Sequence, residues 1–197
     1  MDYTGCRALS DREIDKISSA FSGKYRLRDR AIFLVGVYTG FRVSEILSLK
    51  IQDVLSGSAI RHSVTVRRAF MKGKKSGRTM PLHANARSAI KEWIDSIGGM
   101  NSEGGSPLFP CQGTQKRLSP RTFWGNLKYA ASEAAISTCG IGTHSMRKTF
   151  SSRMWTSPFI GKDLAKMAKL LGHRDPANTL RYIQFLDNSL CQAVLTA

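Results

Sequence analysis

The fold class follows from SVTVRRAFMKGKKSGRTMPL, residues 63–82, in which two strand-like segments flank a glycine-containing turn. Hydrophobic and polar residues alternate at period two over residues 63–67, as they do in a half-buried strand. A turn over residues 73–77 leads to a second short strand over residues 78–82. The stretch therefore predicts an antiparallel hairpin with a strongly basic tip.

On both sides of this hairpin, apolar residues recur at helical spacing. Ser10 and Glu13 form a capping box at the start of the first helix. Ser119 is an N-cap residue, and Pro120 follows it at the first helical position. We expect helices over residues 11–21, 27–38, 43–49, 85–97, 120–135, 143–155, 164–171, 179–186 and 189–195. The predicted fold class is α+β, a mostly helical body with a small antiparallel β-sheet.

Composition points to a globular protein with a polyanionic partner. The 197 residues include 30 Lys and Arg against 14 Asp and Glu, so the formal net charge is +16. With 42% hydrophobic residues the chain is not disordered. The positive charge favours nucleic acid or an anionic membrane surface as partner. No run of about 18 apolar residues occurs, so no membrane span is expected, and the N-terminus carries no secretory signal.

The cysteines indicate neither a metal site nor a disulfide framework. They are widely scattered, without a C-x-x-C pair and without nearby clusters of histidine: Cys6, Cys111, Cys139 and Cys191. Zinc sites need closely spaced ligands. We therefore expect free thiols, in a protein of the cytoplasm.

The positive charge gathers around the predicted hairpin. No acidic residue occurs between residues 54 and 91, where nine basic residues lie. A basic hairpin can lie along a phosphate backbone. The alternative is a solvated turn, although such turns usually mix charges of both signs. The residues expected to contact such a phosphate backbone are Arg67, Arg68, Lys72, Lys74 and Arg78.

Two pairs of polar residues lie three positions apart, so each pair can share one helical face. Arg42 and Glu45 form the first pair, in which the carboxylate could orient the guanidinium. Taken alone, an ion pair on the surface of a helix is the commoner explanation of this spacing. His144 and Arg147 form the second pair, which combines a proton acceptor with a planar binder of oxyanions. A partly buried histidine beside a surface arginine is the alternative.

Two further residues stand near the end of the chain. His173 follows Gly172, the expected end of an apolar helix. Tyr182 comes nine residues later. Because the pKa of tyrosine is about 10, it is a poor nucleophile unless cations and a proton acceptor activate it. Alone, Tyr182 would more often be an aromatic residue at the edge of a core.

Taken in order, these motifs resemble the tyrosine recombinase (phage integrase) family. The resemblance covers residues 9–186 and implies the catalytic domain of that family. Five blocks carry it: TGFRVSEILSL (39–49), KKSGRTMPL (74–82), HSMRKTF (144–150), LLGH (170–173) and TLRYI (179–183).

The resemblance implies site-specific DNA recombination, with cleavage and rejoining through a 3′-phosphotyrosyl intermediate. Arg42 and Arg147 would bind the scissile phosphate, with Glu45 supporting Arg42. Tyr182 would be the nucleophile. The resemblance implies no metal and no cofactor.

Three residues would move protons or contact the phosphate. Lys75 would protonate the leaving 5′-oxygen, because Lys75-Ser76-Gly77 matches the family pattern best; Lys74 is the second choice, and Lys72 is a further candidate. His144 would assist proton transfer at the tyrosine, and His173 would hydrogen-bond the phosphate.

The family also implies partners and an organisation. We expect one catalytic domain over residues 1–197, with a tail over residues 187–197 that docks on a neighbouring subunit or caps its own. The separate N-terminal core-binding domain of most members is expected to be absent. Two explanations of this absence stay open: the chain is a fragment of a longer integrase, or it is naturally short. We expect double-stranded DNA as the substrate, with possible accessory DNA-bending proteins. The protein is expected to be a homotetramer on DNA and a monomer without it. We expect it to act in the cytoplasm, at the nucleoid.

Two other functions remain open from the sequence. One is a topoisomerase-like enzyme that nicks and closes DNA with the same residues. The other is a non-catalytic DNA-binding regulator on the same fold, which the full set of catalytic residues argues against.

Overall fold

The computed structural model describes residues 5–67, 77–98, 105–173 and 177–179. The described residues are mostly helical, with two small antiparallel sheets, which confirms the predicted fold class. The elements are α1 (Asp11–Ala20), α2 (Arg26–Thr39), α3 (Val43–Ile46), α4 (Ile51–Val54), β1 (Leu55–Ser56), β2 (Ala59–Ile60), β3 (Ser63–Val66), β4 (Arg78–Pro81), α5 (Ala84–Ser96), α6 (Pro120–Glu133), α7 (Thr143–Thr156) and α8 (Leu164–Leu171).

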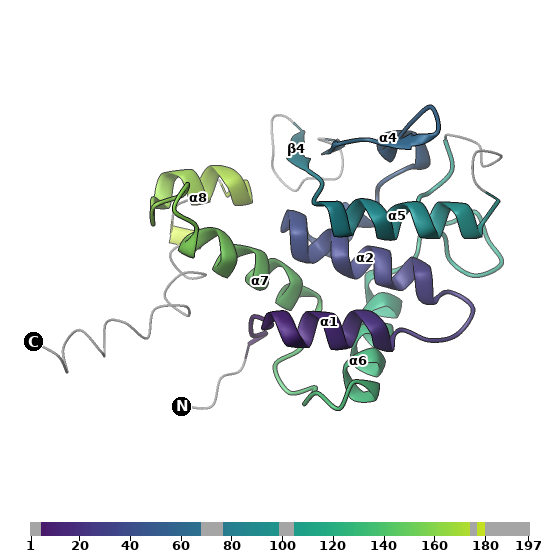
Figure 1. Cartoon of the computed structure of the whole chain (residues 1–197), viewed down its shortest axis with the longest axis horizontal. Helices are drawn as coiled ribbons and strands as arrows, with labels where there is room; N and C mark the ends of the chain where they lie inside the picture. Colours follow the sequence, from purple (N-terminus) through teal and green to yellow (C-terminus); the bar gives the residue numbers. More distant parts are fainter. Residues whose placement is uncertain (1–4, 68–76, 99–104, 174–176, 180–197) are drawn as a thin grey trace, which may run out of the picture.

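Helix α2 forms the centre of the helical body. It packs against α5 on one side and α7 on another, while α1 and α6 pack together beneath it (Figure 1). Its residues are buried from Ala31 to Val37, because neighbours cover every face. A Cβ on Gly36 would lie 2.6 Å from the sulfur of Met146, so the missing side chain permits the close approach of α7.

The predicted hairpin strands are confirmed. Strands β3 and β4 pair antiparallel, with Val64 opposite Met80 and Thr65 opposite Thr79. The valine and methionine side chains are buried, whereas the two threonine hydroxyls bond to each other at 2.8 Å on the exposed face. The predicted turn falls mostly outside the described residues.

The local helix signals are also confirmed. Ser10 and Glu13 form the capping box of α1. The Ser119 side chain accepts the backbone N–H of Thr122 at the start of α6. Gly172 ends α8 in the left-handed conformation, with φ at 67°.

The structure differs from the expected elements around residues 43–60. The predicted helix over residues 43–49 ends at Ile46, and the one-turn helix α4 and the two-residue strands β1 and β2 were not expected. Elements this short show too few residues for a periodicity. Residues 177–179 are helical, and the rest of the predicted C-terminal helices lies outside the described residues.

Within the described ranges, none of the helices combines the length and apolar character that crossing a membrane requires. The same residues contain no group of three or more His, Cys, Asp or Glu side chains suited to a metal ion. Cys6, Cys111 and Cys139 form no disulfide bond within the described part of the chain.

Candidate functional site: an arginine cluster around Glu45

The end of α2 sets the position of Arg42. Gly40 ends the helix with φ at 62°, a conformation that favours glycine. A Cβ there would also lie 2.3 Å from the ring of Phe150 on α7. The chain therefore turns sharply at Gly40, and Arg42 becomes the N-cap residue of α3.

Glu45 is a buried carboxylate shared by two arginines. Its side chain is 1% exposed. Oε1 accepts a hydrogen bond from the guanidinium of Arg42 at 2.9 Å, and Oε2 accepts the backbone N–H of Arg42 at 2.8 Å. Oε2 also lies 3.4 Å from an N–H group of Arg78. Paired charges of this kind tolerate burial that a lone carboxylate would not.

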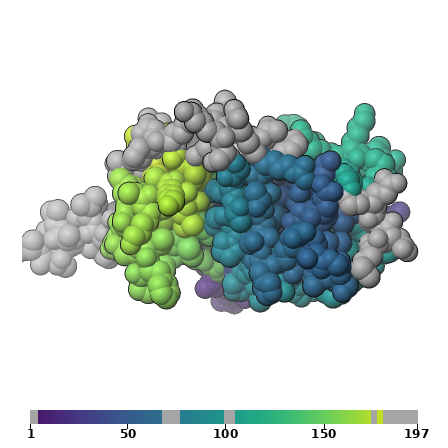
Figure 2. Space-filling model, turned by 90° about the horizontal axis from the view of Figure 1, so that it is seen from above, coloured from purple at the N-terminus to yellow at the C-terminus, as the bar shows by residue number. Residues whose placement is uncertain are grey.

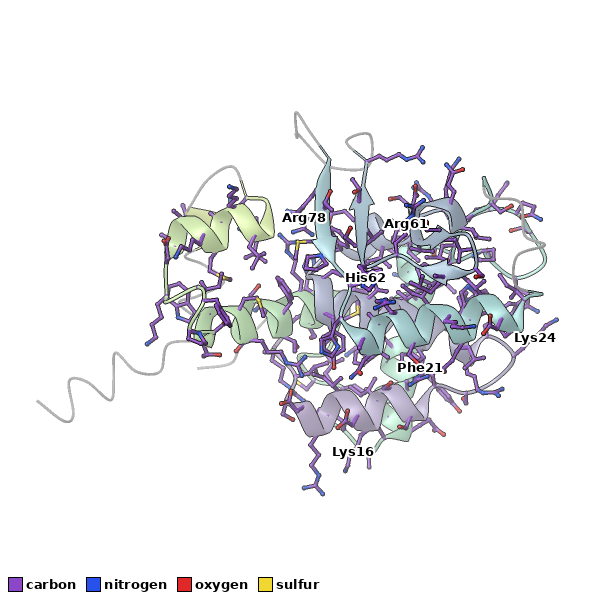
Figure 3. All side chains as sticks on the ribbon, turned by 45° about the horizontal axis from the view of Figure 1, so that its top comes forward. Lys16, Phe21, Lys24, Arg61, His62 and Arg78 are labelled. Atoms are coloured by element: carbon purple, nitrogen blue, oxygen red, sulfur yellow. The ribbon has the colours of Figure 1, made fainter. Side chains whose placement is uncertain are left out.

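Arg78 lies inside the molecule, although it was expected to contact DNA. Its side chain is 9% exposed and stacks over the ring of Phe41, 4.4 Å from the ring centroid. It also donates a hydrogen bond to the carbonyl of Leu170 on α8, at 2.9 Å. Figure 3 shows Arg78 at the side of the strand pair that faces α8.

Burial and positive neighbours lower the pKa of Arg78 to about 10. Desolvation has the largest effect, the positive charges of Arg147 and Arg42 add to it, and Glu45 opposes it. Arg78 stays charged at neutral pH. The cluster therefore holds three guanidinium groups against one carboxylate.

Arg147 is the largest fully buried side chain among the described residues. Its guanidinium donates to the carbonyls of Gly40 at 2.5 Å and Leu171 at 2.6 Å, and lies 3.0 Å from Nε2 of His173. These contacts join the ends of α2 and α8 through one side chain of α7. The glycine that ends α8 turns the chain so that His173 meets Arg147.

The contacts of His173 define which ring nitrogen carries the proton. Arginine can only donate hydrogen bonds, so Nε2 of His173 accepts from Arg147. The neutral ring then carries its proton on Nδ1, which lies 2.9 Å from the hydroxyl oxygen of the buried Thr179. Nδ1 therefore donates to Thr179.

His144, three residues before Arg147, is exposed on α7. Although the residue as a whole is exposed, local burial of the ring lowers its pKa, and the positive charges of Arg147, Arg42 and Lys148 lower it further. This shift favours the neutral ring, which can accept a proton.

Figure 2 shows the same neighbourhood from above, with α7 and α8 in yellow-green beside the strand region in blue. The bond from Arg78 to Leu170 spans 92 positions of the sequence. Cations from α3, β4 and α7 therefore gather where α8 ends. With its excess of positive charge and rigid guanidinium groups, this arrangement suits a tetrahedral oxyanion such as a phosphate.

The structure brings together four of the six catalytic residues predicted from the sequence: Arg42, His144, Arg147 and His173. Lys75 and Tyr182 lie outside the described residues, as do Arg68, Lys72 and Lys74. Arg67 is exposed and pairs with Asp53 at 2.9 Å.

Two features of the site were not predicted from the sequence: the inward direction of Arg78 and the role of Thr179. Arg78 could have been found, because it alternates with the buried residues Met80 and Leu82. No sequence signal marks Thr179 as a partner of His173.

Known proteins match this sequence over nearly the whole chain. A model of the phage integrase family matches residues 7–189. Tyrosine recombinase XerC of Herpetosiphon aurantiacus is 31% identical over 180 residues, covering 89% of this chain and 55% of that protein. Tyrosine recombinase XerA of Pyrococcus furiosus is 30% identical over 193 residues, covering 95% of this chain and 60% of that protein. The chain thus spans little more than half of these relatives.

Solved structures share the fold. The crystal structure of XerA recombinase superposes with a TM-score of 0.73 at 25% identity, over 98% of this chain and 65% of that one. The post-cleavage complex of XerH recombinase with palindromic difH substrate also reaches a TM-score of 0.73, at 24% identity, over 95% of this chain and 52% of that one.

Proposed function

The chain belongs to the phage integrase family, and from this premise we propose that it is a site-specific DNA recombinase of the tyrosine type. It cuts and rejoins double-stranded DNA through a covalent link to Tyr182. The observation that carries this proposal is the meeting of Arg42, Arg147, His144 and His173 around one positively charged site. The DNA complex of the related XerH supports DNA as the substrate.

The arginines bind the scissile phosphate. Arg42 and Arg147 each donate to a non-bridging oxygen and stabilise the charge of the pentacoordinate transition state. Glu45 holds Arg42, and backbone carbonyls hold Arg147, so neither side chain needs to be ordered when DNA arrives. Such preorganisation is worth more than the same charges on mobile side chains.

In the proposed reaction each bond that breaks is matched by one that forms, and the protein's own side chains transfer the protons. The Tyr182 oxygen attacks phosphorus, and neutral His144 takes the phenolic proton. The bond from phosphorus to the 5′-oxygen breaks, and Lys75 protonates that oxygen. The products are a 3′-phosphotyrosyl link and a 5′-hydroxyl, and the reverse steps rejoin a strand.

His173 completes the phosphate site through a change of partner. In the described state its Nε2 accepts from Arg147. When the phosphate binds, Arg147 donates to a phosphate oxygen instead, and Nε2 takes up a proton from solvent, because the negative charge of the phosphate stabilises the imidazolium. His173 then donates to the phosphate while Nδ1 keeps its bond to Thr179.

The larger organisation is part of the proposal. One catalytic domain spans residues 1–197, and four copies act together on two DNA sites, whereas the protein is monomeric without DNA. Residues 187–197 dock on a neighbouring subunit, and DNA-bending proteins assist at some sites.

A covalent capture assay tests the chemistry. Nicked duplexes are selected from a randomised pool by binding to Tyr182→Phe and then mixed with the unmodified protein. We expect a protein–DNA band on a denaturing gel that Tyr182→Phe does not form. A band in that variant would contradict Tyr182 as the nucleophile, and no band in either protein would contradict the proposal.

Two additional measurements refine the proposal. Recombinant products from two labelled duplexes indicate a recombinase, whereas relaxation of supercoils alone indicates a nicking–closing enzyme. A 5′-thio leaving group departs without a proton. It should therefore restore cleavage by Lys75→Ala but not by Lys74→Ala; the opposite result would assign Lys74 as the acid.

A further inference from the structure

Arg78 connects the two halves of the candidate site from inside the molecule. One N–H group of its guanidinium lies 3.4 Å from Glu45, which holds Arg42. Another donates to the carbonyl of Leu170 at 2.9 Å. Leu170 lies next to Leu171, whose carbonyl accepts from Arg147. A single side chain thus contacts the carboxylate that supports Arg42 and the residue next to the carbonyl that supports Arg147.

We propose that Arg78 is a positioning residue for the cleavage reaction: it holds Glu45, and through it Arg42, in register with the end of α8, where Arg147 and His173 lie. The inference rests on the proposed function, because it assigns a role within that reaction. Arg78 acts through Glu45 and the α8 backbone, and it need not touch DNA.

The chemistry of the guanidinium suits this role. Its planar fork can serve two partners in different directions, which the single ammonium of lysine cannot do with the same geometry. Its face also stacks on Phe41, which restricts its rotation.

Stability alone does not explain an arginine at this position. Burial and the nearby charges of Arg147 and Arg42 both disfavour the charged form of Arg78. Replacing a buried ion pair with an apolar residue of similar size is often neutral for stability, provided that the partner charge stays satisfied. Here Glu45 keeps two hydrogen bonds from Arg42 when Arg78 is removed. A methionine at position 78 should therefore fold.

The test compares Arg78→Met and Arg78→Lys with the unmodified protein. Three quantities are measured: the melting temperature, the DNA dissociation constant, and the single-turnover rate of covalent complex formation at saturating DNA. We expect the rate to fall by about 10- to 100-fold in Arg78→Met, with little change in DNA affinity. Arg78→Lys should recover part of the rate, because it keeps the charge beside Glu45.

Arg30→Met is the matched control. Arg30 also bridges other elements, since it donates to Ser18 on α1 and to Glu92 on α5. Neither of these partners is assigned to the site, so its removal should leave the cleavage rate unchanged.

A double-mutant cycle tests the route of the effect. If Arg78 acts through Glu45, Arg78→Met should slow Glu45→Gln by much less than it slows the unmodified protein. Fully additive effects on the rate would overturn the inference. Because the cycle compares rates within each background, a loss of stability common to both cancels.

Other outcomes would overturn the inference in identifiable ways. Weaker DNA binding with an unchanged rate at saturation would make Arg78 a DNA contact. Rescue of Arg78→Met by the 5′-thio substrate would show that it acts through the general acid. An unchanged rate in both variants would remove any role in catalysis. No covalent complex in the unmodified protein would contradict the proposed function rather than the role of Arg78.

Discussion

His173 is held between a donor and an acceptor that together select one form of its ring. Arg147 donates to Nε2, and Nδ1 lies 2.9 Å from the hydroxyl of Thr179. Thr179 is buried, so water does not compete for this contact. Because Thr179 stands three residues before Tyr182, the same bond ties the chain that leads to the proposed nucleophile to the phosphate site.

Replacing Thr179 with valine should disturb His173 while preserving the packing, since valine has nearly the same shape. The lost hydrogen bond costs about 1 kcal/mol, and we expect covalent complex formation to slow by about tenfold. Nitrogen NMR of His173 should show Nδ1–H in the unmodified protein and a reduced share of that form in Thr179→Val.

Thr179→Ser is the control, because it keeps the hydroxyl. Its ring signals and its rate should stay close to those of the unmodified protein. An unchanged Nδ1–H signal in Thr179→Val would contradict the assigned role of Thr179.

Among the elements, the ends of the helices matter most for the site. Helices α2 and α8 both end at a glycine with positive φ, Gly40 and Gly172. The carbonyl of Gly40 and that of Leu171, just before Gly172, accept from Arg147. Unsatisfied carbonyls at a helix end favour a positive charge, so these two helix ends stabilise the buried arginine.

The start of α1 provides a prediction about pH. Hydrogen bonding from Arg7, together with the N-cap bonds from Ser10, lowers the pKa of Glu13 from its ordinary 4.5 to about 2. A carboxyl whose pKa is lower in the folded state stabilises that state above its unfolded pKa. This contribution is lost as the pH falls from about 4.5 towards 2.

Urea unfolding across this range checks the prediction. The unmodified protein should be more stable than Glu13→Gln near neutral pH, and the difference should shrink as the pH approaches about 2. Glu133→Gln, which changes an exposed glutamate of α6, is the control for the removal of one negative charge. A difference between the unmodified protein and Glu13→Gln that stays constant with pH would contradict the role of Glu13.

For the molecule as a whole, the dominant property is its net charge of +16. Part of that charge is inside, since Arg78 and Arg147 are buried. Other positively charged side chains form ion pairs at the surface, as Arg67 does with Asp53. Binding to DNA should therefore draw on the exposed basic residues, whereas the buried Arg147 is reserved for one phosphate and Arg78 for positioning Glu45.

DNA affinity should depend strongly on salt. A protein that neutralises about six to ten phosphates loses roughly 10³- to 10⁵-fold in affinity between about 50 and 200 mM salt. Fluorescence anisotropy with Tyr182→Phe measures this slope without covalent capture. Arg67→Gln should reduce the slope by about 1 if Arg67 contacts a phosphate. A slope near zero would contradict a phosphate-dominated interface.

Local patterns were enough to predict most of the fold. Helix starts and ends depend on side chains within a few positions of one another, as the Ser10–Glu13 box and Gly172 demonstrate. The strands β3 and β4 were equally predictable, because their alternation is also local. Strands β1 and β2 were missed, because two residues cannot display a period.

The candidate site likewise has residues that the sequence marks and contacts that only the structure gives. Arg42, Glu45, His144 and Arg147 form pairs three residues apart, so the sequence alone marked them as candidates. The inward direction of Arg78 follows from its alternation with Met80 and Leu82, but its contacts with Glu45 and Leu170 came only from the packed structure. These contacts join β4 to α3 and α8 across long stretches of chain, and they exist because burial of separate apolar faces brings those elements together.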